Sequence, residues 1–227
     1  LSTLSQRRNT REVQYALSRL SAISSPQHIM SRYLDDLLSG KLVPQLRLDV
    51  LEAATSRAAT NRNLKQRLNQ HHEQVQRKGP LAQYDVALEG GDADIGKSIF
   101  LGKAEAACSK CHALSKTDKQ VGPSLQGIAA RQPRAYLLRS IIDPQAEVVA
   151  GYNVVTLTLD DLSSVTGTLM NETTDAITLK LPDGREKNFA KTEIESRTKP
   201  QSPMPDMTKV LSLTEIRDLV AYLASLR

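Results

Sequence analysis

Apolar residues recur at helical spacing through the first eighty positions of this 227-residue chain. The apolar stripes cover four segments, residues 13–20, 29–38, 46–54 and 64–75. Ser25 and Pro26 separate the first two stripes, and Gly79 and Pro80 follow the last. Spacings of three and four residues place side chains on one helix face, whereas proline and glycine end helices. The pattern therefore predicts four amphipathic helices before residue 80.

The four expected helices form two pairs that repeat after roughly 34 to 40 residues, a period typical of helical solenoids. The segment 45–54 resembles the second half of a HEAT repeat. Two repeats bury too little apolar surface to stand alone easily. Residues 1–80 are therefore predicted to be a HEAT-like helical segment that docks onto a following domain or continues upstream.

Glycine and proline punctuate the next stretch, residues 81–91, which is predicted to be a linker. A second domain is predicted to cover residues 92–227. It begins with a helix that an aspartate can cap, and further helices are predicted over residues 131–142 and 213–227. The helical pattern therefore frames both ends of this domain.

The hydrophobic period changes to two between residues 150 and 197. Alternation of apolar and polar residues predicts four strands, residues 154–159, 165–170, 177–181 and 187–194. Turn-forming residues, such as Asp183 and Gly184, separate the strands. We therefore predict a small antiparallel β-meander inserted in an otherwise helical domain.

Composition narrows the class of protein. Hydrophobic residues make up 40% of the chain, which is enough for a buried core. No apolar run approaches the roughly 18 residues that a membrane helix needs, so no transmembrane segment is expected. The formal charge of +5 arises before residue 92, where 13 Lys or Arg accompany 8 Asp or Glu. Because no basic stripe with interleaved aromatic residues is present, we expect no nucleic-acid binding.

Both cysteines and one of the four histidines fall within residues 108–112, Cys-Ser-Lys-Cys-His. This spacing attaches c-type haem, because two thiols meet the vinyl groups of one porphyrin while the histidine reaches the iron. A redox dithiol is the first alternative, but no buried strand precedes Cys108. A zinc site is the second, but no matching ligand pair lies nearby. We therefore expect one haem c bound through Cys108 and Cys111, with His112 as a metal ligand.

The domain resembles class I cytochromes c in its first helix, its attachment motif and the Gly-Pro that follows the motif. The resemblance implies a close crossing of the first and last helices, with Tyr222 against Gly96 and Phe100. It also implies that the carbonyl of Pro123 accepts the ring hydrogen of His112. Such a bond would orient the histidine and strengthen it as a ligand.

A sixth iron ligand is expected from residues 201–206, where Met204 stands between two prolines. Cytochromes c present an axial thioether just before the last helix, and flanking prolines restrict the backbone that carries it. Met207 is the rival ligand, whereas Met170 lies in a predicted strand and is disfavoured. His112 and Met204 are therefore the expected axial pair.

The wider pattern resembles the planctomycete-type (Pirellula/Verrucomicrobium-type) c-type cytochrome haem-binding domain. The resemblance rests on residues 143–144, 151–152 and 202–205 and on the predicted strands. It implies a mainly α, class I cytochrome c fold with an antiparallel β insertion at about residues 150–197, preceded by the HEAT-like segment. It also implies an exported, periplasmic location in a larger bacterial protein, often with a sugar-dehydrogenase-like domain upstream.

The predicted function is one-electron transfer through a single haem whose potential is raised by methionine ligation and burial. The expected partner is a redox protein or an upstream dehydrogenase domain, and no catalytic residue is predicted in this segment. Two alternatives stay open. One is a haem enzyme or a gas or redox sensor with a labile sixth ligand, and the other is a protein-interaction scaffold in which haem is secondary.

Overall fold

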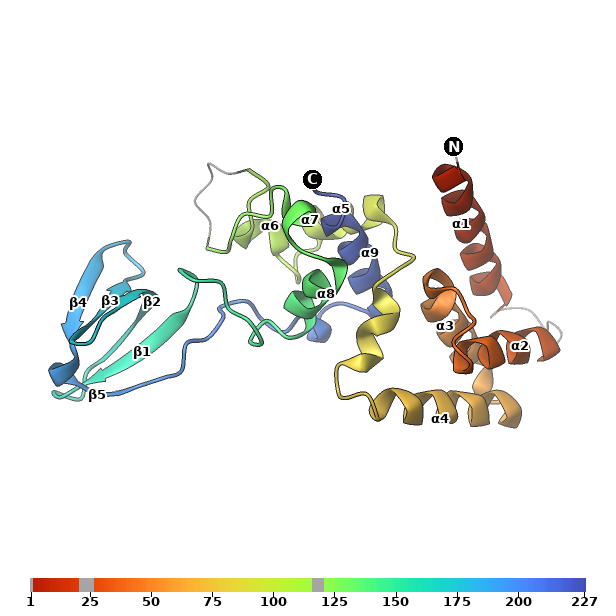
Figure 1. The fold of residues 1–227 in the computed structure, drawn as a ribbon, viewed down its shortest axis with the longest axis horizontal. Helices are drawn as coiled ribbons and strands as arrows, with labels where there is room; N and C mark the ends of the chain where they lie inside the picture. Colours follow the sequence, from red (N-terminus) through yellow and green to blue (C-terminus); the bar gives the residue numbers. More distant parts are fainter. Residues whose placement is uncertain (1, 21–26, 116–120) are drawn as a thin grey trace.

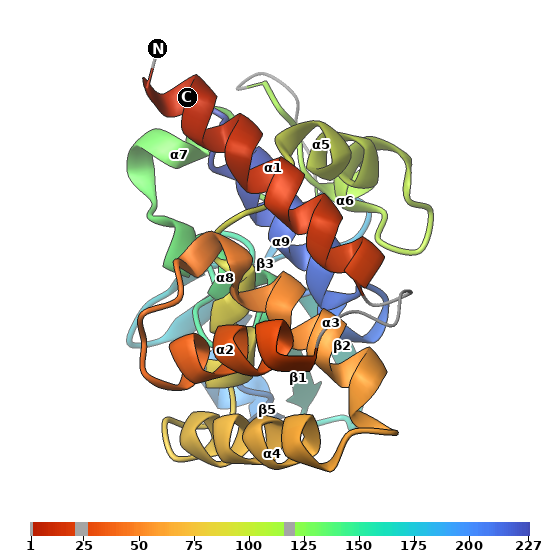
Figure 2. The ribbon, with the colours of Figure 1, turned by 90° about the vertical axis from the view of Figure 1, so that its right-hand side faces the viewer.

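The protein is known from a computed structural model that describes residues 2–20, 27–115 and 121–227. An N-terminal group of helices, a central helical body and a β-sheet succeed one another along the longest axis (Figure 1). Figure 2 looks at the molecule from the side of the N-terminal helices, with the sheet behind the body. The break predicted at Ser25 and Pro26 lies outside the described residues.

The four helices predicted before residue 80 are confirmed. They are α1 Ser2–Leu20, α2 Gln27–Leu38, α3 Arg47–Ala58 and α4 Arg62–Gln76, with the 3-10 helix η1 Pro44–Leu46 before α3. Asn61 begins α4 because its side chain accepts hydrogen bonds from the amides of Asn63 and Leu64. The inner faces of the four helices share one hydrophobic cluster, in which α2 packs on both α3 and α4.

The central body is built from helices that lie far apart in the sequence. Its members are α5 Ala93–Gly102, α6 Cys108–Cys111, α7 Ile128–Arg131, α8 Arg134–Ile142 and α9 Leu213–Leu223, with the 3-10 helices η2 Ala82–Ala87 and η4 Met207–Lys209. Asp92 caps α5, and Ser212 forms a capping box with Glu215 at the start of α9. These helices bury the largest hydrophobic cluster of the described residues.

The first and last helices of the body cross closely, as predicted. A Cβ atom at Gly96 would overlap the carbonyl oxygen of Asp218, so only glycine allows the two backbones to approach this far. The rings of Phe100 and Tyr222 lie 5.6 Å apart between centroids and are tilted by 54°. Tilted packing of this kind is favourable for aromatic pairs. The predicted contact of Tyr222 with Gly96 and Phe100 is therefore confirmed.

The sheet has five antiparallel strands in the order β4-β3-β2-β1-β5, not the four of the predicted meander. The strands are β1 Val154–Leu159, β2 Ser164–Glu172, β3 Ala176–Lys180, β4 Glu186–Ala190 and β5 Ile194–Arg197. The single strand predicted over residues 187–194 is wrong, because the 3-10 turn η3 Lys191–Glu193 divides it. The chain then returns across the sheet, and β5 pairs with β1.

The expected class I cytochrome c fold with a small inserted meander is therefore wrong. About half of the chain is helical, and the C-terminal part carries a five-stranded antiparallel sheet. The sheet has a hydrophobic cluster of its own, in which Leu157, Leu179 and Phe189 are at most 1% exposed. A sheet that buries its own apolar face forms a separate layer of the structure. A helical fold with a small inserted meander has no such layer.

Residues 81–91 join the N-terminal helices to the body through close backbone contacts. A Cβ atom at Gly90 would overlap the carbonyl oxygen of Gln45, and one at Gly91 would overlap that of Arg217. Because glycine has no Cβ, the chain can touch α9 and the segment before α3 at successive positions. The predicted linker is thus packed against both neighbours.

A largely buried ion pair reinforces this junction. The guanidinium of Arg217 on α9 lies 2.8 Å from the carboxylate of Asp49 on α3, and the two side chains are 7% and 12% exposed. Gln14 of α1 donates a hydrogen bond to the same carboxylate at 3.1 Å. The division into residues 1–80 and 92–227 stays a prediction, and the ion pair joins the two segments.

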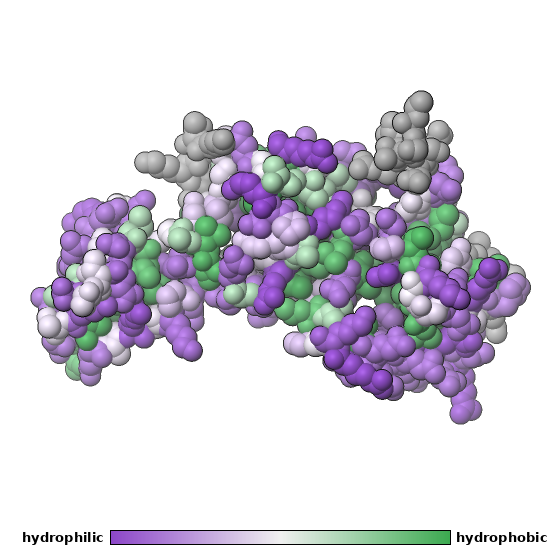
Figure 3. Space-filling model, in the orientation of Figure 1, coloured by the Kyte–Doolittle hydropathy of each residue, from purple (hydrophilic) through white to green (hydrophobic). Residues whose placement is uncertain are grey.

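The surface differs between the ends and the middle of the molecule. Hydrophilic residues cover much of the sheet and of the N-terminal helices, whereas hydrophobic patches show in the central body (Figure 3). Ile95 and Leu101 on α5 are each 52% exposed. Within the parts of the chain that the structure describes, no helix combines the length and apolar character needed to cross a membrane.

Candidate functional site

The cysteine motif lies on α6, a single helical turn at the edge of the central body. Ala107 precedes the turn with a φ of 47°, a left-handed conformation that redirects the chain. The amide of His112 donates to the carbonyl of Cys108 at 2.9 Å and closes the turn. Cys108 and Cys111 are free thiols, and burial raises the pKa of the Cys108 thiol. One short turn therefore carries all three side chains of the motif.

The ring of His112 contacts the carbonyl of Pro123 across the loop that follows the motif. The distance from Nδ1 to the carbonyl oxygen is 2.9 Å. A carbonyl oxygen only accepts hydrogen bonds, so this contact requires the ring hydrogen on Nδ1. The lone pair then resides on Nε2, which is the nitrogen available to a metal in this tautomer. The structure thus brings together His112 and Pro123, two of the predicted site residues.

Gly122, which directly precedes Pro123, lies against the same ring. A Cβ atom at this position would lie 2.8 Å from Cε1 of His112 and 3.0 Å from Nδ1. The amide of Gly122 donates to the carbonyl of Cys111 at 2.8 Å, which fixes the position of the glycine. No role for this glycine was predicted from the sequence. The sequence offered one indication of this role, namely that Gly122 directly precedes Pro123. The structure shows that a side chain at this position would crowd the ring.

Two further bonds tie the loop back to the residues after the motif. The amide of Leu125 donates to the carbonyl of Ala113 at 2.9 Å. The hydroxyl of Ser124 donates to the carbonyl of Ser115 at 2.7 Å. Ala113 is buried. These bonds join the residues after Pro123 to the residues after His112, and so they hold the loop against the predicted histidine ligand.

The predicted methionine ligand lies in the loop before η4. Met204 is partly buried and packs against the central hydrophobic cluster, which Cys108 and Leu125 also border. Its amide donates to the hydroxyl oxygen of Ser202 at 3.1 Å. The loop and the cysteine motif therefore rest on the same core, and the role of Met204 as a ligand stays a prediction.

The two rival methionines have different surroundings. Met207 begins η4 and is 3% exposed, with its side chain in the central hydrophobic cluster. Met170 lies on β2 and is 42% exposed. A core methionine is engaged in packing, and one on the sheet belongs to a different layer of the molecule.

The residues of the motif fit a covalently attached haem. Two free thiols lie on one turn, and the tautomer fixed by Pro123 leaves Nε2 of His112 for a metal. In such a centre the porphyrin supplies four nitrogen ligands, so the protein has to supply only the axial ones. A cluster of three or more His, Cys, Asp or Glu side chains that could hold a metal ion does not occur among the described residues. Two cysteines and one histidine are fewer donors than the four that a structural zinc site uses, and they match the set that attaches a c-type haem.

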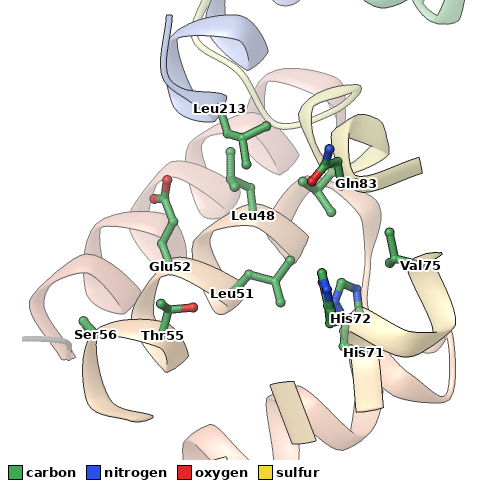
Figure 4. Close-up of a pocket in the computed structure, with 11 residues that line it drawn as sticks. Leu48, Leu51, Glu52, Thr55, Ser56, His71, His72, Val75, Gln83 and Leu213 are labelled. Carbon is green, nitrogen blue, oxygen red and sulfur yellow. The ribbon is translucent and has the colours of Figure 1, made fainter. Parts of the chain in front are cut away.

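A cavity of 460 Å³ lies elsewhere, between the N-terminal helices and the body (Figure 4). Its lining comes mainly from α3 and α4 and includes Leu48, Leu51, His71 and Leu213. Burial lowers the pKa of His71, because a charged imidazole is poorly solvated there. The cavity contains none of the predicted site residues.

Comparisons with known proteins point to the cytochrome c class for part of the chain. No family model matches it. A stretch of 66 residues is 33% identical to a cytochrome c-553-like protein of Synechocystis sp., and covers 29% of this chain and 57% of that protein. The chain therefore spans little more than half the length of this relative. The match supports a cytochrome c-type relationship, and it does not confirm the planctomycete type or the HEAT repeats.

Proposed function

We propose that this chain is a c-type cytochrome segment that carries one haem through Cys108 and Cys111 and transfers single electrons. The observation that carries the proposal is the 2.9 Å contact between Nδ1 of His112 and the carbonyl of Pro123, beside two free cysteines on one turn. The similarity to a cytochrome c-553-like protein over 66 residues supports it.

Each residue has a distinct part in the proposed site. Cys108 and Cys111 hold the porphyrin by thioether bonds, and Nε2 of His112 ligates the iron. Pro123 keeps the hydrogen of His112 on Nδ1 and so maintains the ligating tautomer. Met204 would supply a second iron ligand, a thioether that favours the reduced state. The bound haem supplies an iron that changes its charge by one electron.

The wider setting is part of the proposal. Residues 92–227 would be a planctomycete-type haem-binding domain, and residues 1–80 a HEAT-like neighbour. The domain would accept electrons from a redox partner or an upstream dehydrogenase domain in a larger bacterial protein. Because haem is attached to thiols outside the bacterial inner membrane, the proposed location is periplasmic or otherwise exported.

Covalent attachment is tested by the mass of the denatured protein after production in a bacterial periplasm that matures c-type haem. We expect the mass of the polypeptide plus one haem. The double variant Cys108→Ala, Cys111→Ala should lose the haem to organic solvent, because no thioether remains. Ser109→Ala, which changes only the intervening serine, is the matched control and should retain it. A parent protein with the bare polypeptide mass contradicts the proposal.

A further inference from the structure

Backbone bonds restrain the loop that carries Met204. Two of its residues are prolines, which have no amide hydrogen. The amide of Gln201 donates to the carbonyl of Val154 at 2.9 Å, and the amide of Val154 donates back to Gln201 at 2.8 Å. The amide of Met204 donates to the side chain of Ser202. The start of the loop is therefore paired with the start of β1.

Gln145 holds the same loop from the other side. Its Nε2 donates to the carbonyl of Ser202 at 3.0 Å, and its Oε1 accepts from the amide of Ser202 at 2.9 Å. The two residues are 57 positions apart in the chain. A carboxamide that engages both backbone groups of one residue fixes its position and its orientation together. The pair thus acts as a two-point clamp on the residue two positions before Met204.

The clamp is anchored in the central body. Gln145 follows α8, whose last turn is continued by bonds from the amide of Asp143 to Arg139 at 2.8 Å and from that of Ala146 to Asp143 at 3.0 Å. Pro144, inside this turn, is buried. Gln145 therefore extends from a fixed turn at the end of a core helix.

The other end of the loop is equally fixed. The carboxylate of Asp206 accepts from the amide of Thr208 at 3.0 Å and so caps η4. Met207 follows with its side chain in the central core. Only the residues between Ser202 and Asp206 lie between two anchors, and Met204 is at their centre.

We propose that Gln145 is a positioning residue for Met204. Its clamp, with the bridge between Val154 and Gln201, fixes the stem through which the sheet joins the body (Figure 1). Without the clamp, the loop would follow motions of the sheet and carry the thioether away from its place. The inference rests on the proposed function, because it requires Met204 to face the haem iron.

The first test is optical and uses the ferric haem protein. Methionine ligation gives a weak near-infrared band, and its loss on raising the pH reports displacement of the thioether. Gln145→Ala should weaken this band and lower the pH at which it disappears. Gln83→Ala is the matched control, since its amide also donates to a backbone carbonyl, that of Pro80, at 3.2 Å. It should leave the band unchanged.

The second test is hydrogen exchange at the amide of Ser202, measured in a Met204→Ala background so that ligation contributes nothing. Loss of the clamp should speed exchange there by about five-fold to ten-fold, the effect of one ordinary hydrogen bond. A role in general stability alone would move the unfolding midpoint and leave the near-infrared band of Gln145→Ala intact.

The results distinguish a failure of the positioning role of Gln145 from a failure of the proposed function. A parent protein with the band, and a Gln145→Ala variant with unchanged band and unchanged exchange, overturn the positioning role alone. A parent protein without the band contradicts ligation by Met204, and the positioning role falls with it. A weakened band together with faster exchange supports both.

Discussion

The two proposed iron ligands are held in different ways. His112 is fixed by Gly122 and Pro123, which are neighbours in the same loop. The Met204 loop is fixed by Gln145, which contacts it from 57 positions away, and by the strand that begins at Val154. The histidine side is therefore a local structure, and the methionine side depends on how the whole C-terminal part folds.

The difference has consequences for stability. The bonds around His112 adjoin buried residues such as Ala113, so they should open only when the body unfolds. The bonds of Gln145 to Ser202 are exposed to solvent, and exposed bonds open in small local fluctuations. We therefore expect the methionine side to open more often than the histidine side.

The largest effect is expected from Phe100→Ala. Phe100 is buried in the central hydrophobic cluster, which Cys108 borders, and it packs on Tyr222. Its truncation should therefore lower the free energy of unfolding by about 3–5 kcal/mol. Hydrogen exchange should then accelerate strongly at the amide of His112 and much less at that of Ser202. Exchange followed by mass spectrometry or NMR measures both sites.

Leu101→Ala is the matched control for this change, because the neighbouring side chain is 52% exposed. It should alter the free energy of unfolding by well under about 1 kcal/mol. Equal acceleration at both amides in Phe100→Ala would show that the two sides of the site open together. This would contradict the expected difference between the histidine side and the methionine side.

A smaller effect is expected from Gly122→Ala. The added methyl group would lie 2.8 Å from Cε1 of His112, so the ring or the loop must shift. We expect a loss of about 1–3 kcal/mol in the free energy of unfolding, typical of overpacking, and an altered ligand-field spectrum of the haem protein. Denaturant titration and absorption spectra give the two values.

Gly102→Ala serves as the control for the glycine change, since no atom lies within 4 Å of a Cβ built there. It should be neutral or slightly stabilising. If Gly122→Ala were as well tolerated as Gly102→Ala, the proposed support of the histidine ring by the loop would be wrong.

The smallest effect is expected from Ser202→Ala. The variant loses the acceptor for the amide of Met204, a partly buried bond of 3.1 Å worth about 0.5–1.5 kcal/mol. Exchange at the Met204 amide should accelerate while exchange at His112 stays constant. Ser98→Ala, which removes a hydroxyl bonded within α5 to Asp94, is the comparison. Acceleration at His112 in Ser202→Ala would mean that the sides are coupled.

The difference between local and long-range contacts also explains which features could be predicted from the sequence. One local feature and one long-range contact were predicted correctly. An aspartate was expected to cap the first helix of the body, and Asp92 does so. The close crossing of Gly96 and Phe100 with the last helix was implied by the resemblance to class I cytochromes c. The cap follows from the residue type at a helix start, whereas the crossing rests on the resemblance. The role of Gly122 was within reach, because it stands beside Pro123 in the loop that the motif begins.

Contacts between distant segments could not be predicted in this way. Alternation identified most strands but not the return of β5 to β1, because strand pairing depends on the path of the chain between them. Arg217 and Asp49 are 168 positions apart, and no local pattern marks them as an ion pair. Gln145 carried no local signal at all, since its partner is the backbone of Ser202.

The proposed function requires His112 and Met204 to ligate one haem iron. The most direct measurement is the near-infrared absorption of the ferric protein in the parent, Met204→Ala and Met207→Leu, the last chosen because leucine conserves the volume of a core methionine. We predict a methionine–iron band that disappears only in Met204→Ala. A high-spin spectrum or ready carbon monoxide binding by the parent, or a band that survives in Met204→Ala, would contradict ligation by Met204.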